Sequence, residues 1–248
     1  MIRPYMLLPL LLIILALLVA VPLVLVARRD RRRSGPAVAA AAAVRPGWTG
    51  VPAPAPVGLK RRYHSRQPFN GPNPGFRNLL YGPLADGAQA EVFHFGTTYR
   101  QTKSAVVSSW TVACVVLPRP LPSVSVRPTG DPAEAQTPVP VGDGHAQSYN
   151  EATFGPLWTG LRGYALDPAA AAALFTPEVL GRTRALGLDW RMEGRTVLAV
   201  APDHRPPAAM LELVDNLAWF ASLLPEEVLL AAAEQPDPWA GPSAERPA

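Results

Sequence analysis

An unbroken apolar run near the N-terminus, residues 5–27, is the feature that most constrains how this chain can fold. As a helix, the run would be about 35 Å long at about 1.5 Å per residue, enough to cross a hydrocarbon core about 30 Å thick. Pro9 and Pro22 lie near its two ends, where a missing backbone donor is least harmful. The run therefore predicts one transmembrane helix and a single-pass membrane protein.

The basic residues around this run predict its orientation. Only Arg3 precedes it, whereas a topology signal of closely spaced arginines follows it: Arg28, Arg29, Arg31, Arg32 and Arg33. By the positive-inside rule, the N-terminus lies outside the cell membrane and the C-terminal domain lies in the cytoplasm. A cleavable signal peptide is the alternative, but its apolar core would be shorter, about 7–15 residues, and the arginines resist translocation.

Proline-rich and alanine-rich segments limit the length of chain that can fold as a domain. The chain has 30 prolines among its 248 residues, against a usual share of about 5%. We expect an anchor with a basic flank over residues 1–33, an extended Ala/Pro-rich linker over 34–60, and a disordered tail over 235–248. Residues 61–234 are then one α+β domain, with a flexible insertion near 129–147.

Alternating apolar residues predict the strands of a small antiparallel sheet. Residues 105–117 carry apolar side chains on both faces, which indicates a central strand, and residues 88–95 predict another. Because Pro118–Pro120 interrupts the alternation, we expect a hairpin with a second strand over 123–127. Asp189–Ala201, with Glu193-Gly194 in its middle, is typical of a further hairpin.

Capping signals predict helices in the second half of the chain. Asp167-Pro168 and Thr176-Pro177 each indicate a helix start, and Gly187 indicates a helix end. Residues 208–224 place their apolar side chains on one helical face, so this amphipathic C-terminal helix is expected to pack on the sheet. A short helix follows, with Glu226 and Glu227 favourably placed at its start.

No arrangement of residues predicts catalysis, a cofactor or a bound metal. The sequence lacks a nucleophile elbow, a phosphate-binding loop, a dinucleotide fingerprint and a His-Glu-x-x-His pair. The histidines at positions 64, 94, 145 and 204 are scattered over different segments, so we expect no shared metal site. The single cysteine, Cys114, lies in an apolar run and is interpreted as a buried thiol.

Trp219 is the residue that we expect to contact a partner protein. It lies on the 208–224 helix, away from the centre of its apolar face, where a tryptophan can lie at an interface. The other tryptophans are interpreted as core or interface residues.

The order of segments resembles a group of uncharacterised single-pass membrane proteins of actinobacteria that carry a β-rich domain of unknown function. The matching pieces are Arg66–Phe69, Trp110–Pro128 and Tyr164–Pro177, and together they span most of residues 61–225. Residues 149–163 depart from the group, because Leu157 and Trp158 stand where related sequences have phenylalanine. The resemblance implies a membrane anchor and a β-rich domain, and it implies no activity and no catalytic residues.

We therefore predict a non-catalytic binding or scaffold module at the inner face of the membrane. Its partners would be the lipid bilayer, through residues 5–27, and an unknown protein. We expect no nucleic acid, because the basic excess lies beside the membrane and lacks interleaved aromatic residues. The alternative hypothesis is a membrane-tethered enzyme whose pocket gathers groups such as Glu91, His94 and Asp189.

Overall fold

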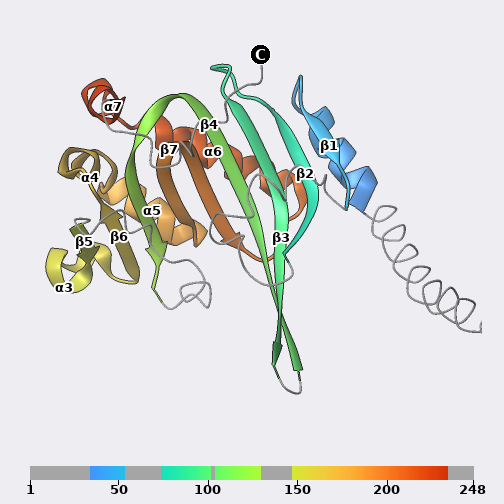
Figure 1. Ribbon diagram of the computed structural model, residues 1–248, viewed down its shortest axis with the longest axis horizontal. Helices are drawn as coiled ribbons and strands as arrows, with labels where there is room; N and C mark the ends of the chain where they lie inside the picture. Colours follow the sequence, from blue (N-terminus) through green and yellow to red (C-terminus); the bar gives the residue numbers. More distant parts are fainter. Residues whose placement is uncertain (1–33, 54–73, 102–103, 130–146, 234–248) are drawn as a thin grey trace, which may run out of the picture.

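The computed structural model describes residues 34–53, 74–101, 104–129 and 147–233 (Figure 1). It confirms the predicted α+β class, an antiparallel sheet with several helices packed on it. The strands are β1 (Thr49–Val51), β2 (Gly75–Pro83), β3 (Gln89–Gln101), β4 (Ser104–Pro128), β5 (Gln147–Asn150), β6 (Leu161–Ala165) and β7 (Asp189–Pro202). The helices are α3 (Glu151–Phe154), the 3-10 helix η3 (Pro156–Trp158), α4 (Pro168–Leu174), α5 (Pro177–Leu186), α6 (Pro207–Ser222) and α7 (Glu226–Ala233).

Strand β4 is the centre of the sheet, as the sequence predicts for residues 105–117. The strand order is β1-β2-β3-β4-β6-β5, and β7 also pairs with β4. Along one edge of β4, the first half pairs with β3 and the second half with β6, while β7 pairs with both halves along the other edge. In Figure 1, β4 forms an arch, and β7 lies inside it.

Strands β4 and β7 are bent, and neither forms the hairpin expected from its turn residues. Pro118–Pro120 lies within β4, where the register with β7 shifts between Val116 and Leu121. A bulge tolerates proline because its backbone needs no ladder donor there. Arg195 satisfies the exposed backbone, since its Nε donates to the Leu117 carbonyl (3.1 Å) and its Nη2 to the Pro118 carbonyl (2.8 Å).

The bend of β7 lies opposite the bend of β4. Gly194 pairs with Leu121 and has a left-handed backbone, φ 57°, which glycine adopts without steric cost. Both predicted hairpins are therefore wrong. The residues that predicted each turn instead bend one long strand. The two bent strands, β4 and β7, pair with each other.

The helix ends follow the predicted capping residues. Asp167 caps α4 by accepting from the Ala169 amide (2.8 Å), and Thr176 caps α5 by accepting from the Val179 amide (3.3 Å). Helix α5 ends at Gly187, whose φ of 61° is left-handed. The amphipathic segment forms α6 and the acidic pair opens α7, as predicted.

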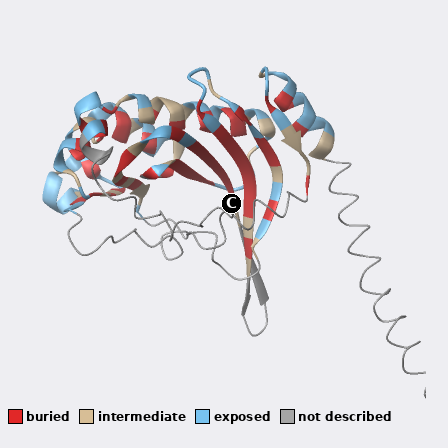
Figure 2. Ribbon diagram, turned by 45° about the horizontal axis from the view of Figure 1, so that its top comes forward, coloured by how far each residue is buried: buried red, intermediate tan, exposed pale blue. Residues whose placement is uncertain are grey.

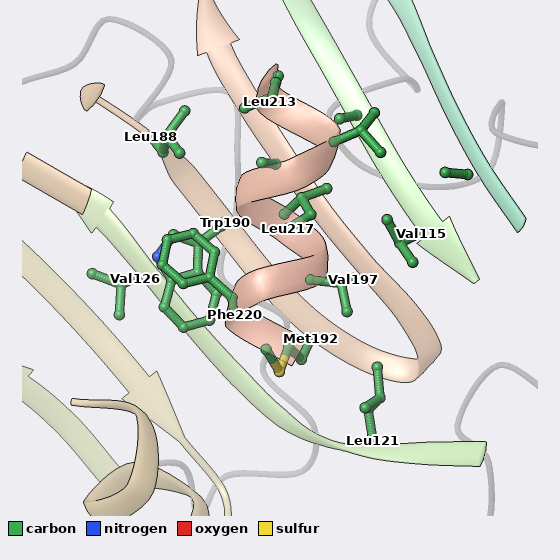
Figure 3. Packing of buried hydrophobic residues seen from close by; sticks show 14 of the residues in the cluster. Val115, Leu121, Val126, Leu188, Trp190, Met192, Val197, Leu213, Leu217 and Phe220 are labelled. Atoms are coloured by element: carbon green, nitrogen blue, oxygen red, sulfur yellow. The ribbon is translucent and has the colours of Figure 1, made fainter. Parts of the chain in front are cut away.

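The main core lies between the sheet and the helices that cover one of its faces (Figure 2). Trp190 of β7 stacks on Phe220 of α6, with ring centroids 4.7 Å apart (Figure 3). Both residues are fully buried. Trp190 Nε1 donates to Thr183 Oγ1 (2.9 Å), so the indole N–H of this buried ring is satisfied by a residue of α5. We call the sheet surface that this core covers the helix-covered face.

A second apolar cluster lies on the opposite face of the sheet, at the end where β3 pairs with the first half of β4. Its buried members come from β2, β3, β4 and β7, and they are Phe76, Leu79, Phe93, Phe95, Trp110, Val112, Cys114, Leu198 and Val200. Cys114 is a free thiol with 1% of its surface exposed, which confirms the interpretation as a buried cysteine.

The described part of the expected linker is not extended. Residues 34–43 are helical, and β1 then pairs with β2. Alanine is the best helix former, and this short helix is held to the domain by the fully buried Val38. Beyond its end, Arg45 forms an ion pair with Asp215 of α6, and Trp48 Nε1 donates to the Pro83 carbonyl (2.8 Å).

Several predictions concern residues outside the described ranges. They are the transmembrane run at 5–27, the arginine topology signal, all but the two ends of the insertion predicted near 129–147, and the tail predicted over 235–248. Within the described ranges, no helix combines the length and the apolar character needed to cross a membrane.

Candidate functional site

The residues proposed for an enzyme pocket do not come together. Val92 packs into the core on the helix-covered face and Phe93 into the cluster on the other face, so Glu91 and His94 point to opposite faces. Asp189 opens β7, whereas Ala201, at the far end of β7, lies beside Thr111, the β4 partner of His94. His94 and Asp189 therefore lie near opposite ends of the sheet.

His94 is held in one tautomer by two hydrogen bonds. Its Nε2 lies 2.8 Å from the Arg205 carbonyl oxygen, which can only accept, so Nε2 carries the proton. Its Nδ1 lies 3.1 Å from Asn78 Nδ2, which donates. The amide orientation of Asn78 is fixed in turn, because its Oδ1 accepts from the Ala53 amide (3.1 Å). A neutral imidazole satisfies both bonds.

His204 stacks on His94, with ring centroids 4.5 Å apart and an interplanar angle of 11°. Burial lowers the pKa of His94 from 6.5 to about 4, and the charges of His204 and Arg77 add to this effect, while the hydrogen bond to the Arg205 carbonyl opposes it. The pKa of His204 is also lowered, chiefly by burial. Near neutral pH, both rings are uncharged. Their contacts with backbone carbonyls help to hold residues 203–206, the turn that leads into α6.

Thr111 completes the attachment of this turn to the sheet. Its Oγ1 donates to the Asp203 carbonyl (2.8 Å) and accepts from the Arg205 amide (2.8 Å). Asp203 has a positive φ of 63°, so the turn is a constrained conformation. We call His94, His204, Asn78 and Thr111 the histidine clamp, and its bonds to backbone atoms indicate a structural role.

An open cleft of about 260 Å³ lies where the bend of β4 meets the C-terminal end of α6. Its apolar walls are Leu84, Leu117, Ala218, Ala221, Leu224 and Leu229, and its polar groups are Asp86, Arg119 and Ser222. The small side chains of Ala218 and Ala221 leave the space open, and the bulge at Leu117–Arg119 forms the wall opposite. A cleft lined by both apolar and polar side chains suits a partner or ligand group that has an apolar part and a polar part.

Trp219, the residue predicted to contact a partner, lies on α6 between Ala218 and Phe220. The Arg182 guanidinium of α5 lies 4.2 Å from the centroid of its ring, in cation–π geometry. The ring is partly buried and packs against the main core. Contact with a partner stays a prediction for Trp219.

The cleft could not be predicted from the sequence, because it depends on a bend whose residues are equally typical of a hairpin turn. Two of the four histidines, His94 and His204, come together in the clamp, whereas His64 and His145 lie outside the described residues. Among the residues that the structure describes, no group of three or more His, Cys, Asp or Glu side chains could hold a metal ion.

Comparisons with known proteins give a likeness among solved structures. No protein-family model matches the chain. No curated protein matches it either. Among solved structures, the fold is similar to the crystal structure of the mycobacterial trehalose monomycolate transport factor A, TtfA, with a TM-score of 0.50 and 14% sequence identity. The likeness covers 79% of this chain and 98% of the TtfA chain, and at this identity it shows a shared fold.

Proposed function

We propose that this protein is a membrane-tethered, non-catalytic accessory module of a transport system, which binds a partner protein beside the membrane. The observation that carries the proposal is the shared fold, because it spans 98% of a chain that is named as a transport factor. Glu91, His94 and Asp189, which the enzyme alternative offers as examples of pocket residues, lie apart on the sheet, so they give that alternative no support.

The anchor and its orientation come from the sequence. The apolar run at residues 5–27 is long enough to span the bilayer, and the arginines that follow it favour a cytoplasmic domain. Residues 34–53 pack on the domain, so only a short stretch separates the folded part from the predicted membrane segment. The domain would therefore work close to the membrane surface.

The cleft beside α6 is the surface that we assign to the partner. Its leucine and alanine side chains can contact an apolar side chain, and Asp86 and Arg119 in its lining offer charges of both signs for orientation. Trp219 is not part of the cleft lining, and its partly buried ring lies against Arg182 of α5, so it would offer the partner a separate contact on α6.

Site-specific photocrosslinking in intact membranes tests this assignment. A photoreactive side chain replaces Ala221 in the cleft of the full-length protein, and the same group replaces the exposed Ala172 of α4 as a matched control. We expect a discrete protein adduct from position 221 and none from position 172. Ala218→Trp, which fills the cleft, should abolish the adduct without loss of folding. Equal adducts at both positions, or none at 221, would refute the proposal.

A further inference from the structure

The cleft at the bend of β4 has the size of a site for one large side chain. Its volume is about 260 Å³, whereas pockets that hold drug-sized ligands have volumes of about 300–1,000 Å³. Leucine and alanine side chains line most of it, and Asp86 is among its polar residues. A tryptophan suits such a lining, because its ring is apolar and its indole N–H can donate to a carboxylate.

The chain that follows α7 starts close to this cleft. Leu229 of α7 is part of the lining, and α7 ends at Ala233, the last residue that the structure describes. We call residues 234–248 the C-terminal segment, and its single large apolar side chain is that of Trp239. The helical step from Leu229 to Ala233 is about 6 Å, and an extended chain from Ala233 to Trp239 covers about 20 Å. Trp239 can therefore reach back to the cleft.

Prolines on both sides of Trp239 reduce the entropic cost of docking it. Pro236 and Pro238 precede it, and Pro242 follows it. Because proline fixes φ near −65°, a proline-rich segment favours an extended conformation and loses less conformational entropy when it binds. Proline-rich segments are a recurring class of ligand for surface grooves.

Charge supplies a further and weaker match. Arg119 is exposed in the lining of the cleft, and Asp237 lies two positions before Trp239. An ion pair between exposed side chains contributes little, because water and salt screen it. The ring, and not the charge, is therefore the main contact.

We infer that the C-terminal segment docks in the cleft, with Trp239 as the side chain that fills it. The cleft is also the surface that we assign to a partner protein, so the segment would compete with that partner and regulate its binding. The competition rests on the proposed function, whereas the docking does not.

Disulfide formation between engineered cysteines tests the docking in the purified full-length protein. Ser222→Cys places a thiol in the cleft and Ala240→Cys places one beside Trp239, and the two can join only when their Cα atoms come within about 7 Å. Leu230→Cys with Ala240→Cys is the matched control, because Leu230 is 63% exposed on α7 and lies outside the cleft lining. The native Cys114 is 1% exposed, so it does not compete.

We expect the cleft pair, positions 222 and 240, to oxidise faster than the control pair, although the control positions are nearer in sequence. Trp239→Ala should slow the cleft pair about tenfold, because it removes the ring that is buried on docking, and should leave the control pair unchanged. Ala218→Trp, which fills the cleft, should also slow the cleft pair. An unchanged rate in Trp239→Ala overturns the inference. Disulfide-linked dimers overturn it too, because they assign the cleft to the segment of a second copy.

Photocrosslinking from position 221 in membranes then tests the competition. Trp239→Ala should raise the yield of the partner adduct, because the segment no longer fills the cleft, and an unchanged yield overturns the competition. If position 221 gives no adduct with or without Trp239, the proposed function fails. The oxidation rates of the cleft pair decide the docking in either case.

Discussion

Acidification should destabilise this protein through His94, and the size of the effect follows from the structure. His94 has 6% of its surface exposed, and its folded-state pKa is about 4 against an ordinary value of 6.5. Between these values, the unfolded chain binds a proton that the folded protein does not. The free energy of unfolding contributed by this group is therefore fully present above pH 6.5 and is lost as the pH falls to about 4. At about 1.4 kcal/mol per pKa unit, the loss is about 3 kcal/mol.

The two hydrogen bonds of the His94 ring explain why its protonation is unfavourable in the folded state. Protonation would place a second N–H against Asn78 Nδ2, which is itself a donor, and the Ala53 amide holds Asn78 in that orientation. The imidazolium would also face the positive charge of Arg77, which lies opposite His94 on β2. Both effects act against the charged ring in the folded state.

Urea unfolding of the wild type and of His94→Gln at pH 7, 5.5 and 4.5 measures this contribution. The variant should be less stable at pH 7, because it disturbs the bonds to Asn78 and Arg205, but its stability should fall less between pH 7 and pH 4.5. The carboxylates that titrate in the same pH range are present in both proteins. Their contribution therefore cancels when the pH-dependent change in the free energy of unfolding of one protein is subtracted from that of the other. His204→Gln removes one cause of the lowered pKa and should flatten the dependence to a smaller degree. An identical pH dependence in the wild type and His94→Gln would refute the reasoning.

Three further predictions concern the core, a close contact and the topology. Thr183→Val leaves the buried Trp190 Nε1 without its acceptor and should cost about 1–3 kcal/mol, measured by chemical denaturation. Gly163→Ala would place a Cβ 2.5 Å from Trp158 Cη2, so the tryptophan must move, and we expect about 1–3 kcal/mol of destabilisation, with Gly181→Ala, which meets no atom within 4 Å, as the control in thermal unfolding. Reporter fusions after residue 60 and at the C-terminus should be active only as cytoplasmic reporters, and activity only in the exported form would reverse the predicted orientation.

The helices of this fold could be predicted from the sequence because their signals are local. Asp167 and Thr176 each reach an amide two or three residues away, and Gly187 provides a left-handed end, so nothing distant was needed to recognise them. The helix at residues 34–43 was missed because flanking prolines suggested a linker. Its stability depends on distant partners, since Val38 is buried against the domain and the nearby Arg45 pairs with Asp215.

The strand pairing could not be predicted, because the same residues serve a turn or a bend. Pro118–Pro120 and Glu193-Gly194 both have turn chemistry, and each is compatible with a two-residue reversal or with a bulge in a longer strand. The side chain of Arg195 decides between them in this structure, by binding carbonyls about 77 positions away in sequence. The neighbours across β4, β6 and β7 could not be predicted for the same reason, since only the structure reveals the register of these three strands.

The paired bend also divides the sheet into two parts with different surroundings. The bulge at Leu117–Arg119 forms a wall of the cleft, and beyond it β4 exchanges β3 for β6 as its neighbour. Before the bend, the face opposite the helices is aromatic and buried, and after it the same face carries arginines. One sheet thus has a cleft at its bend and a polar face beyond it. Since Arg195 holds the bulge through the Leu117 and Pro118 carbonyls, Arg195→Leu should weaken crosslinking from position 221 in the cleft, whereas β6 and the second half of β4 keep their own pairing.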